Sequence, residues 1–156
     1  MSIWWSLHLR RDAASVPLAR RLLLGTMETA GVDPDVCYDL SVALSEACAN
    51  AVEHGGGTTS EAYRVTAYLD GEKCRIEVAD SGPGFAHEDR AHEDRAHGER
   101  TAPRVSSAEA EHGRGLFLIR QLADHVHIGN KPGIGGAVVS FDKMLKWRED
   151  APLVAV

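Results

Sequence analysis

The chain has 156 residues, of which 44% are hydrophobic, and a formal net charge of −6. These numbers predict one globular domain, and so acidic a chain lacks the broad basic surface with which proteins bind nucleic acid. No apolar run approaches the roughly 20 residues of a membrane-spanning helix, and the first residues lack a signal-peptide pattern. Because Cys37, Cys48 and Cys74 form no Cys-x-x-Cys pair, we expect buried, reduced thiols in a cytoplasmic protein.

The first residues predict a strand followed by a helix. Apolar and polar residues alternate over residues 3–10, which is typical of a half-buried strand, with Trp4 on its outer face. Trp4 could extend a sheet or pair across a dimer. An apolar stripe then predicts a helix that Ser15 caps, that runs to about Ala30 and that ends at Gly31.

A second helix and a β-hairpin are expected next. Asp33-Pro34 is a cap followed by proline at the first helical position, and the apolar stripe continues to His54. Two alternating stretches predict strands over residues 63–69 and 73–79. The Asp70-Gly71 pair between them is typical of a hairpin turn.

The last third of the chain predicts a helix over residues 113–123 and a further strand pair. The two strands are expected over residues 126–129 and 137–141. The order β-α-α-β-β-α-β-β is typical of the α+β class. We therefore expect a single domain over residues 1–156, a two-layer sandwich whose mixed, mostly antiparallel sheet carries the helices on one face.

A tandem repeat of five residues occupies positions 86–100 and contains almost no apolar side chain. Such a segment cannot bury a face, so we expect it to be mobile or only locally helical. Its three histidines could bind a metal, but regular spacing in a duplicated stretch more often reflects the duplication alone. Its place between two glycine motifs is where a lid over a ligand would lie.

Three polar residues four positions apart lie on the second predicted helix. Glu46, Asn50 and His54 therefore share one helix face. The simplest interpretation is a solvated stripe. A carboxylate that can take a proton, beside an amide oxygen that can hold a hard cation, is also what phosphoryl transfer requires.

Two glycine-rich blocks follow. Asp80-Ser81-Gly82-Pro83-Gly84 ends a predicted strand and could be only an Asp-initiated turn, or a carboxylate that accepts a hydrogen bond from a base. His112-Gly113-Arg114-Gly115-Leu116 opens the third predicted helix, where free N–H groups could hold phosphates. The chain contains neither a P-loop nor the glycine pattern of a Rossmann turn.

In this order and spacing, the three blocks resemble the motifs of the GHKL superfamily of ATPases and kinases, which has the Bergerat nucleotide-binding fold. The match is closest to the small bacterial serine-kinase anti-sigma factors. The N-box Glu-x-x-x-Asn-Ala-x-x-His corresponds to Glu46–His54, and the first glycine box to Asp80–Gly84. The second glycine box corresponds to Gly113–Leu116, which is followed by an apolar helix and then by Asp124.

The resemblance implies a role for each residue. Glu46 would be the general base, Asn50 would coordinate Mg²⁺ at the phosphates of ATP, and Asp80 would bind the adenine amine. His54 would have a supporting role. Residues 85–112 would form the ATP lid. The nucleotide-binding set implied by the resemblance is Asn50, Asp80, Gly82, Gly84, Gly113, Arg114, Gly115 and Leu116.

Two departures from the family pattern bear on activity. The family usually has Gly-Thr before the last strand, with the threonine near the adenine-binding aspartate, whereas Gly136-Ala137 offers no hydroxyl here. The missing hydrogen bond would cost about 1 kcal/mol of ATP binding. The repeat at 86–100 also enlarges the lid.

The resemblance implies an ATP-dependent serine kinase that phosphorylates an anti-anti-sigma partner with a STAS domain, sequesters a sigma factor and forms a homodimer. A non-catalytic module that binds partners in response to ATP or ADP is the alternative. A nucleotide-independent scaffold with a decayed pocket is a third. Glu46 favours the kinase, because nucleotide binding alone requires no base, while Ala137 favours the alternatives.

Overall fold

The computed structural model describes residues 2–54, 62–80, 107–130 and 136–151, with the backbone alone at residues 54, 107–114 and 130. The described helices and strands are β1 (Ile3–Arg10), α1 (Ser15–Ala30), α2 (Pro34–His54), β2 (Ala62–Leu69), β3 (Lys73–Asp80), α4 (Ser107–Leu122), β4 (His125–Asn130) and β5 (Ala137–Met144). Their order is the predicted one.

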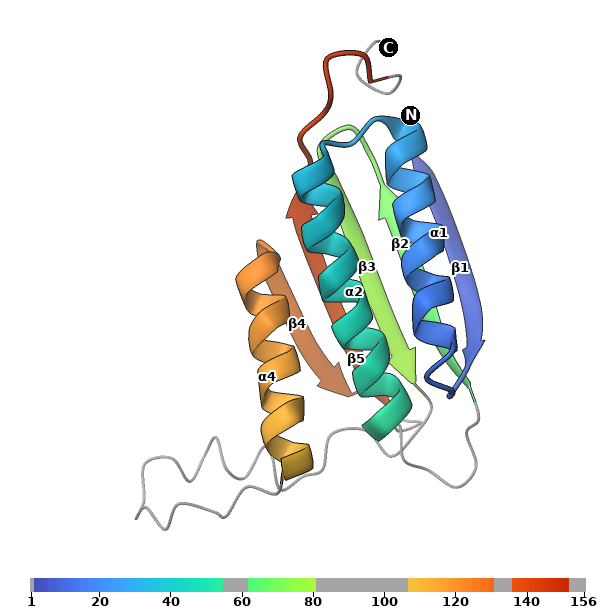
Figure 1. Cartoon of the computed structure of the whole chain (residues 1–156), viewed down its shortest axis with the longest axis vertical. Helices are drawn as coiled ribbons and strands as arrows, with labels where there is room; N and C mark the ends of the chain where they lie inside the picture. Colours follow the sequence, from blue (N-terminus) through green and yellow to red (C-terminus); the bar gives the residue numbers. More distant parts are fainter. Residues whose placement is uncertain (1, 55–61, 81–106, 131–135, 152–156) are drawn as a thin grey trace.

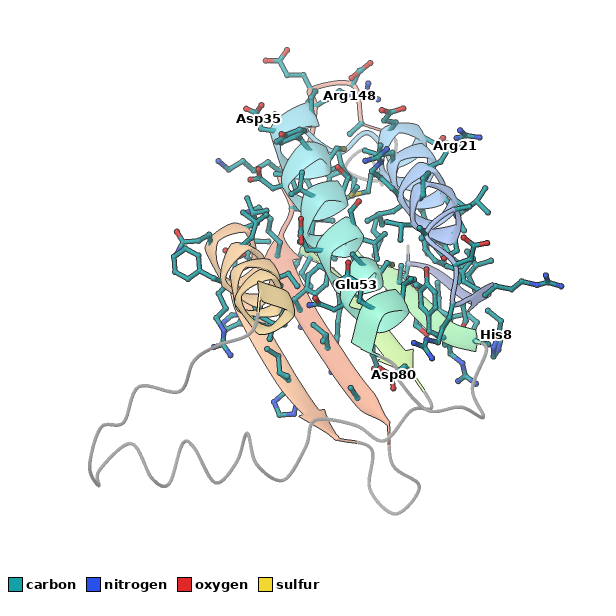
Figure 2. All side chains as sticks on the ribbon, turned by 60° about the horizontal axis from the view of Figure 1, so that its bottom comes forward. His8, Arg21, Asp35, Glu53, Asp80 and Arg148 are labelled. Atoms are coloured by element: carbon teal, nitrogen blue, oxygen red, sulfur yellow. The ribbon has the colours of Figure 1, made fainter. Side chains whose placement is uncertain are left out.

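The five strands form one sheet in the order β1-β2-β3-β5-β4, and the three described helices cover one of its faces (Figure 1). This confirms the predicted two-layer α+β sandwich. Every described strand pair is antiparallel, so the sheet is more regular than the mixed one expected. Strand β3 is central in the sheet. It ends at Asp80, at the end of the molecule where Glu53 of α2 lies, whereas Asp35 and Arg148 lie at the opposite end (Figure 2).

Alternation along the strands places their apolar side chains under the helices. Cys74, Ile76 and Val78 of β3 are buried, whereas Trp4 on the other face of β1 is 65% exposed, as predicted. Helix α2 is the central helix and supplies much of the core. Its fully buried or nearly buried apolar side chains are those of Val36, Cys37, Leu40, Ala43, Leu44, Ala47, Cys48 and Ala51.

The ends of α1 and α2 confirm the signals predicted at Gly31 and at Asp33-Pro34, but not the one at Ser15. Gly31 ends α1 in the left-handed region with φ 94°, and Asp33 caps α2 by accepting a 2.9 Å hydrogen bond from the Asp35 N–H group. The prediction that Ser15 caps α1 is wrong. Ser15 is the first helical residue, and its buried hydroxyl bonds the Asp12 carbonyl and the hydroxyl of Tyr63. A tertiary contact therefore replaces the local cap.

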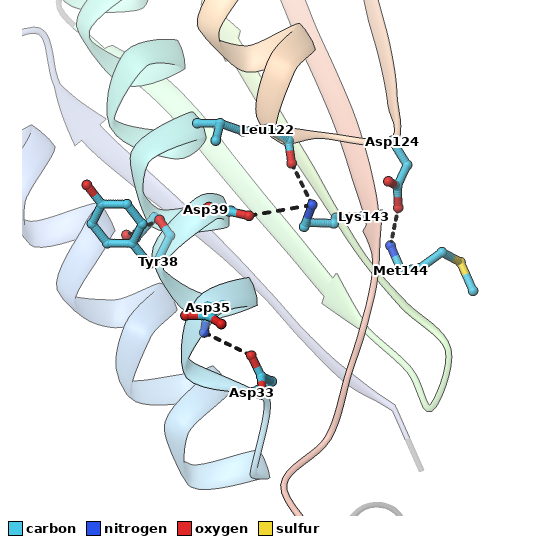
Figure 3. A network of polar contacts seen from close by, with 9 residues as sticks. Asp33, Asp35, Tyr38, Asp39, Leu122, Asp124, Lys143 and Met144 are labelled. Carbon is cyan, nitrogen blue, oxygen red and sulfur yellow. Dashed lines mark hydrogen bonds and ion pairs between the residues drawn. The ribbon is translucent and has the colours of Figure 1, made fainter.

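Helix α4 begins at Ser107, earlier than the predicted Gly113, and ends at Leu122. Its C-terminal end is tied to the rest of the fold (Figure 3). Lys143 of β5 donates a 2.8 Å hydrogen bond to the Leu122 carbonyl and lies 3.7 Å from the Asp39 carboxylate of α2. A cation at a helix C-terminus is favourable, so Lys143 holds α4, α2 and β5 together.

The residues after β5 pack against the end of the molecule that is remote from Asp80. Trp147 pairs with Val32 in an isolated bridge and donates a 3.0 Å hydrogen bond to the Gly71 carbonyl. Sequence patterns did not predict this contact. In the part of the chain that the structure describes, no helix has the length and apolarity required to cross a membrane.

The three cysteines are free and buried, as predicted. Burial raises the pKa of Cys37 to about 11 and those of Cys48 and Cys74 to about 12, from 9.0. The negative charges of Glu28 and Asp33 raise the pKa of Cys37 further, and the charges of Cys37 and Asp70 do the same for Cys74. At Cys48, a hydrogen bond with Tyr63 lowers the pKa and so opposes the effect of burial. The folded state therefore keeps these protons when the unfolded state has lost them.

We expect these thiols to make the protein sensitive to alkali. Because their pKa values are raised in the folded state, their contribution to stability is complete below pH 9 and is lost as the pH rises towards 11–12. Each fully buried thiol should lower the free energy of unfolding by about 1.4 kcal/mol per pH unit in that window. Urea titrations at several pH values measure this slope, which the double variant Cys48→Ala, Cys74→Ala should reduce. Rapid alkylation of the folded protein at neutral pH would contradict the burial.

Candidate nucleotide site

The C-terminal half of α2 faces α4, and this contact brings three of the predicted site residues together. A Cβ atom built on Gly115 of α4 would lie 3.1 Å from Glu46 Oε2 and 3.4 Å from Asn50 Oδ1. The four-residue spacing therefore does place the carboxylate and the carboxamide on one helix face, as predicted. Helix α4 packs on that face, so only part of the face is exposed to solvent. The side chain of His54, the third residue of the pattern, lies outside the described side chains.

Asn50 is the most informative polar residue of this face. Only 9% of it is exposed, and its Nδ2 atom is buried without a hydrogen-bond partner among the described residues. An unpaired buried donor costs about 1–3 kcal/mol. A phosphate oxygen would satisfy this donor, and the neighbouring Oδ1 atom is the kind of ligand that Mg²⁺ prefers. The donor set therefore fits a magnesium–phosphate group.

Asp80 is the last residue of β3 and is 6% exposed. The pairing of β3 with β5 ends at Ala79 and Val138, and beyond it the Asp80 carboxylate accepts a 3.1 Å hydrogen bond from the Ala137 N–H group. A carboxylate oxygen thus takes the place of the next main-chain acceptor between the two strands. This hydrogen bond fixes the Asp80 carboxylate at the end of β3. The structure places Ala137 beside Asp80, where the family pattern has its threonine. Sequence patterns did not predict this main-chain donor.

The second glycine block lies inside α4 and not at its start. Gly113, Arg114, Gly115 and Leu116 all follow Ser107, so their N–H groups fall where the helix hydrogen-bonds its own carbonyls. The expectation that these groups lie free at a helix N-terminus is therefore wrong for this conformation. Gly115 instead contributes the close approach of its backbone to Glu46 and Asn50.

Several predicted features lie outside the described residues. Gly82, Gly84 and the histidine repeat at 86–100 are among them, and of the expected lid at 85–112 only residues 107–112 are described, as the first turns of α4. Among the described residues, no group of three or more histidine, cysteine or acidic side chains could hold a metal ion. The coordination of Mg²⁺ by Asn50 stays a prediction.

Two residues that form hydrogen bonds near the site, Tyr63 and Arg11, were not predicted. Tyr63 is opposite Asp80 in the β2–β3 register, and its hydroxyl bonds Ser15. Burial raises the pKa of Tyr63, so the phenol stays protonated. Arg11, in the turn after β1, donates a 3.0 Å hydrogen bond to the Val52 carbonyl near the end of α2. Neither residue has a sequence signal, because each contact joins segments that are distant in the chain.

Comparisons with known proteins support the resemblance drawn from the three motifs. Residues 9–143 match the family described as histidine kinase-like ATPase domain. The chain is 28% identical to the serine-protein kinase RsbW of Staphylococcus aureus, over 93% of this chain and 91% of that protein. It is 33% identical to the serine-protein kinase RsbW of Bacillus pumilus, over 81% of this chain and 78% of that protein.

Two solved structures share the fold. One contains the RsbU and RsbW domains of Rv1364c from Mycobacterium tuberculosis, with a TM-score of 0.65 and 22% identity over 93% of this chain and 32% of that chain. The other is the SiaB–SiaC complex from Pseudomonas aeruginosa, with a TM-score of 0.55 and 13% identity over 90% of this chain and 88% of that chain. The resemblance drawn from the three motifs is thus confirmed at the level of the family. The chain belongs to the family of histidine kinase-like ATPase domains.

Proposed function

We propose that this protein is an ATP-dependent serine kinase of the anti-sigma-factor type. It phosphorylates a serine of a STAS-domain anti-anti-sigma partner, and the phosphorylation decides whether it holds that partner or a sigma factor. The observation that carries the proposal is the meeting of Glu46 and Asn50 at Gly115, with a buried Asn50 Nδ2 atom that has no acceptor among the described residues. Relatives named serine-protein kinase RsbW support the same activity.

In this proposal, Glu46 is the general base. Its carboxylate takes the proton of the serine hydroxyl as the oxygen bonds to the terminal phosphorus and ADP leaves. Phosphoryl transfer depends mainly on positioning and charge neutralisation, so one base and well-placed donors suffice. Glu46 is half-buried, which allows access for a protein substrate.

Asn50 and Asp80 bind the two ends of the nucleotide in this proposal. Asn50 Oδ1 would hold Mg²⁺, which when bound neutralises phosphate charge. Asp80, whose orientation Ala137 fixes, would accept a hydrogen bond from the adenine amine. We assign nucleotide contacts also to Gly82, Gly84, Gly113, Arg114, Gly115 and Leu116. For the amides of Gly113–Leu116 to reach phosphate, residues 107–112 must leave the helix, which would free these N–H groups while Gly115 stays in a helical turn that faces Glu46.

The test is incubation with labelled ATP, Mg²⁺ and candidate STAS-domain proteins from the same genome. Labelled phosphoserine on a STAS protein is the expected result. Complexes that depend on ATP or ADP but carry no label would replace the kinase with the non-catalytic binding module. That alternative is favoured by one observation, the enclosure of the Gly113–Leu116 amides within α4. No nucleotide-induced shift in melting temperature would contradict both.

We further propose that the protein is a cytoplasmic homodimer. Its three free cysteines suit a reducing compartment, and Trp4 of the edge strand β1 is exposed for pairing with a second copy. Light scattering of the purified protein measures the oligomeric state. A mass equal to that of one chain at every protein concentration measured would contradict the dimer.

Replacement of Asp80 tests the nucleotide assignment separately from catalysis. Asp80→Asn should weaken ATP binding about tenfold or more, because a hydrogen bond to a charged acceptor contributes about 1.5–3 kcal/mol. An asparagine oxygen can still accept from the Ala137 N–H group, so the melting temperature should change little. Asp35→Asn, at the opposite end of the molecule, is the matched control. Equal ATP affinity in both variants would remove Asp80 from the site.

A further inference from the structure

Gly115 lies in the interior of α4, where a glycine is unfavourable. Glycine is less compatible with a helix interior than alanine because it has more backbone freedom to lose. Gly25 in α1 is a second glycine of this kind and provides a comparison. A Cβ atom at Gly25 would meet nothing within 4 Å, so no contact requires glycine there. The surroundings of Gly115 are different.

A side chain at position 115 would meet the two polar ends of the proposed site. Its Cβ atom would lie 3.1 Å from Glu46 Oε2, and 3.4 Å and 3.6 Å from the Oδ1 and Nδ2 atoms of Asn50. The contact with Glu46 is closer than ordinary van der Waals contact, whereas the contacts with Asn50 are ordinary. The carboxylate of Glu46, at the end of a flexible side chain, would therefore be the group that moves.

Helix α4 cannot easily retreat to make room. Ile119, four residues further along, is fully buried in the core, and Lys143 holds the Leu122 carbonyl at the end of the helix. Asn50 is itself buried. A methyl group at position 115 would therefore displace the carboxylate of Glu46.

We propose that Gly115 is a positioning residue for Glu46. The absence of a side chain lets the backbone of α4 lie against the carboxylate and fixes where that carboxylate rests, beside Asn50. This role is distinct from the donation of an N–H group to phosphate, and it rests on the proposed kinase function. It predicts that a methyl group at position 115 impairs the chemical step while leaving the fold and the nucleotide affinity nearly unchanged.

The test compares Gly115→Ala with Gly25→Ala. Both changes improve helix propensity, so both variants should melt at the same temperature as the wild type or roughly 2–4 °C above it. Gly115→Ala should lower kcat about tenfold, because displacements of a few tenths of an ångström at a reacting group are costly. Alanine keeps the backbone N–H group that the proposed function assigns to nucleotide binding, so the dissociation constant of this variant for Mg²⁺-ADP should change less than about threefold. Gly25→Ala should change neither quantity.

A double-mutant cycle separates the positioning role from a direct phosphate contact. If Gly115 acts through the carboxylate, Gly115→Ala should lower kcat no further in the Glu46→Gln background, where no base remains. Effects that multiply in the double variant, or kcat values equal in Gly115→Ala and Gly25→Ala, would overturn this inference alone. A wild-type protein that transfers no phosphate to any STAS protein would overturn the proposed function and, with it, this inference.

Discussion

Glu46→Gln is expected to lower the rate of phosphoryl transfer by about 10²–10⁴-fold, the usual contribution of a general base. Glutamine has nearly the same shape as glutamate, so the contact with Gly115 and the course of α2 should be kept. A carboxamide cannot take the proton of the serine hydroxyl. Nucleotide affinity should therefore stay within about threefold of the wild type, which titration with a fluorescent ADP analogue measures beside the transfer assay.

Glu77→Gln is the matched control for this change. Glu77 is also half-buried, but it lies on the face of β3 opposite to the helices, since Cys74, Ile76 and Val78 point towards them. The Glu77→Gln change removes one negative charge outside the candidate site, so phosphoryl transfer should be unchanged. Undiminished transfer in Glu46→Gln would contradict the assignment of Glu46 as base. A parallel loss of nucleotide binding would assign it to binding instead.

The parts of the fold that local signals determine were predictable from the sequence. Asp33-Pro34 and Gly31 mark helix ends through their own backbone preferences, and both predictions are confirmed. The alternation of β1 and β3 likewise placed their inward faces correctly. These signals need no knowledge of the rest of the chain, which explains why the order of helices and strands agrees with the prediction.

The predicted start of α4 at Gly113 is wrong, since the helix begins at Ser107. The prediction began the helix at the glycines, because glycines often precede helices and a free N-terminus suits phosphate. Residues 107–112 are rich in alanine and glutamate, which are strong helix formers, and the helix extends through them to Ser107. Propensity thus decides this boundary. Gly115 then serves close packing rather than a helix start.

The contacts that shape the candidate site depend on tertiary structure. The hydrogen bond from Ala137 to Asp80 requires β5 to lie beside β3, and the approach of Gly115 to Glu46 requires α4 to pack on α2. Spacing along the chain predicted that Glu46 and Asn50 share a face, but it could not show what covers that face. That Asn50 Nδ2 finds no acceptor within the described ranges is also visible only in three dimensions.

The buried amide of Asn50 leads to two predictions of opposite sign, a gain in stability and a loss of nucleotide binding. Asn50→Leu should stabilise the protein, because an apolar group of similar shape replaces a buried donor that has no acceptor in the described part of the chain. The expected gain in the free energy of unfolding is about 1–2 kcal/mol, or a rise of roughly 2–8 °C in melting temperature. Ser41→Ala is the control, since Ser41 is buried on the same helix but already donates a 2.8 Å hydrogen bond to the Tyr38 carbonyl. It should give little or no gain.

The same Asn50→Leu variant should lose magnesium-dependent nucleotide binding by about 100-fold, because it removes both the oxygen that would hold Mg²⁺ and the donor for phosphate. The shift in melting temperature produced by ADP, measured with Mg²⁺ and again with EDTA, reports this loss without any activity assay. A lower melting temperature in Asn50→Leu would mean that the amide is satisfied in the free protein. An unchanged magnesium-dependent shift would remove Asn50 from the site. A gain in stability together with a loss of binding would show that α2 keeps a costly buried amide because the ligand needs it.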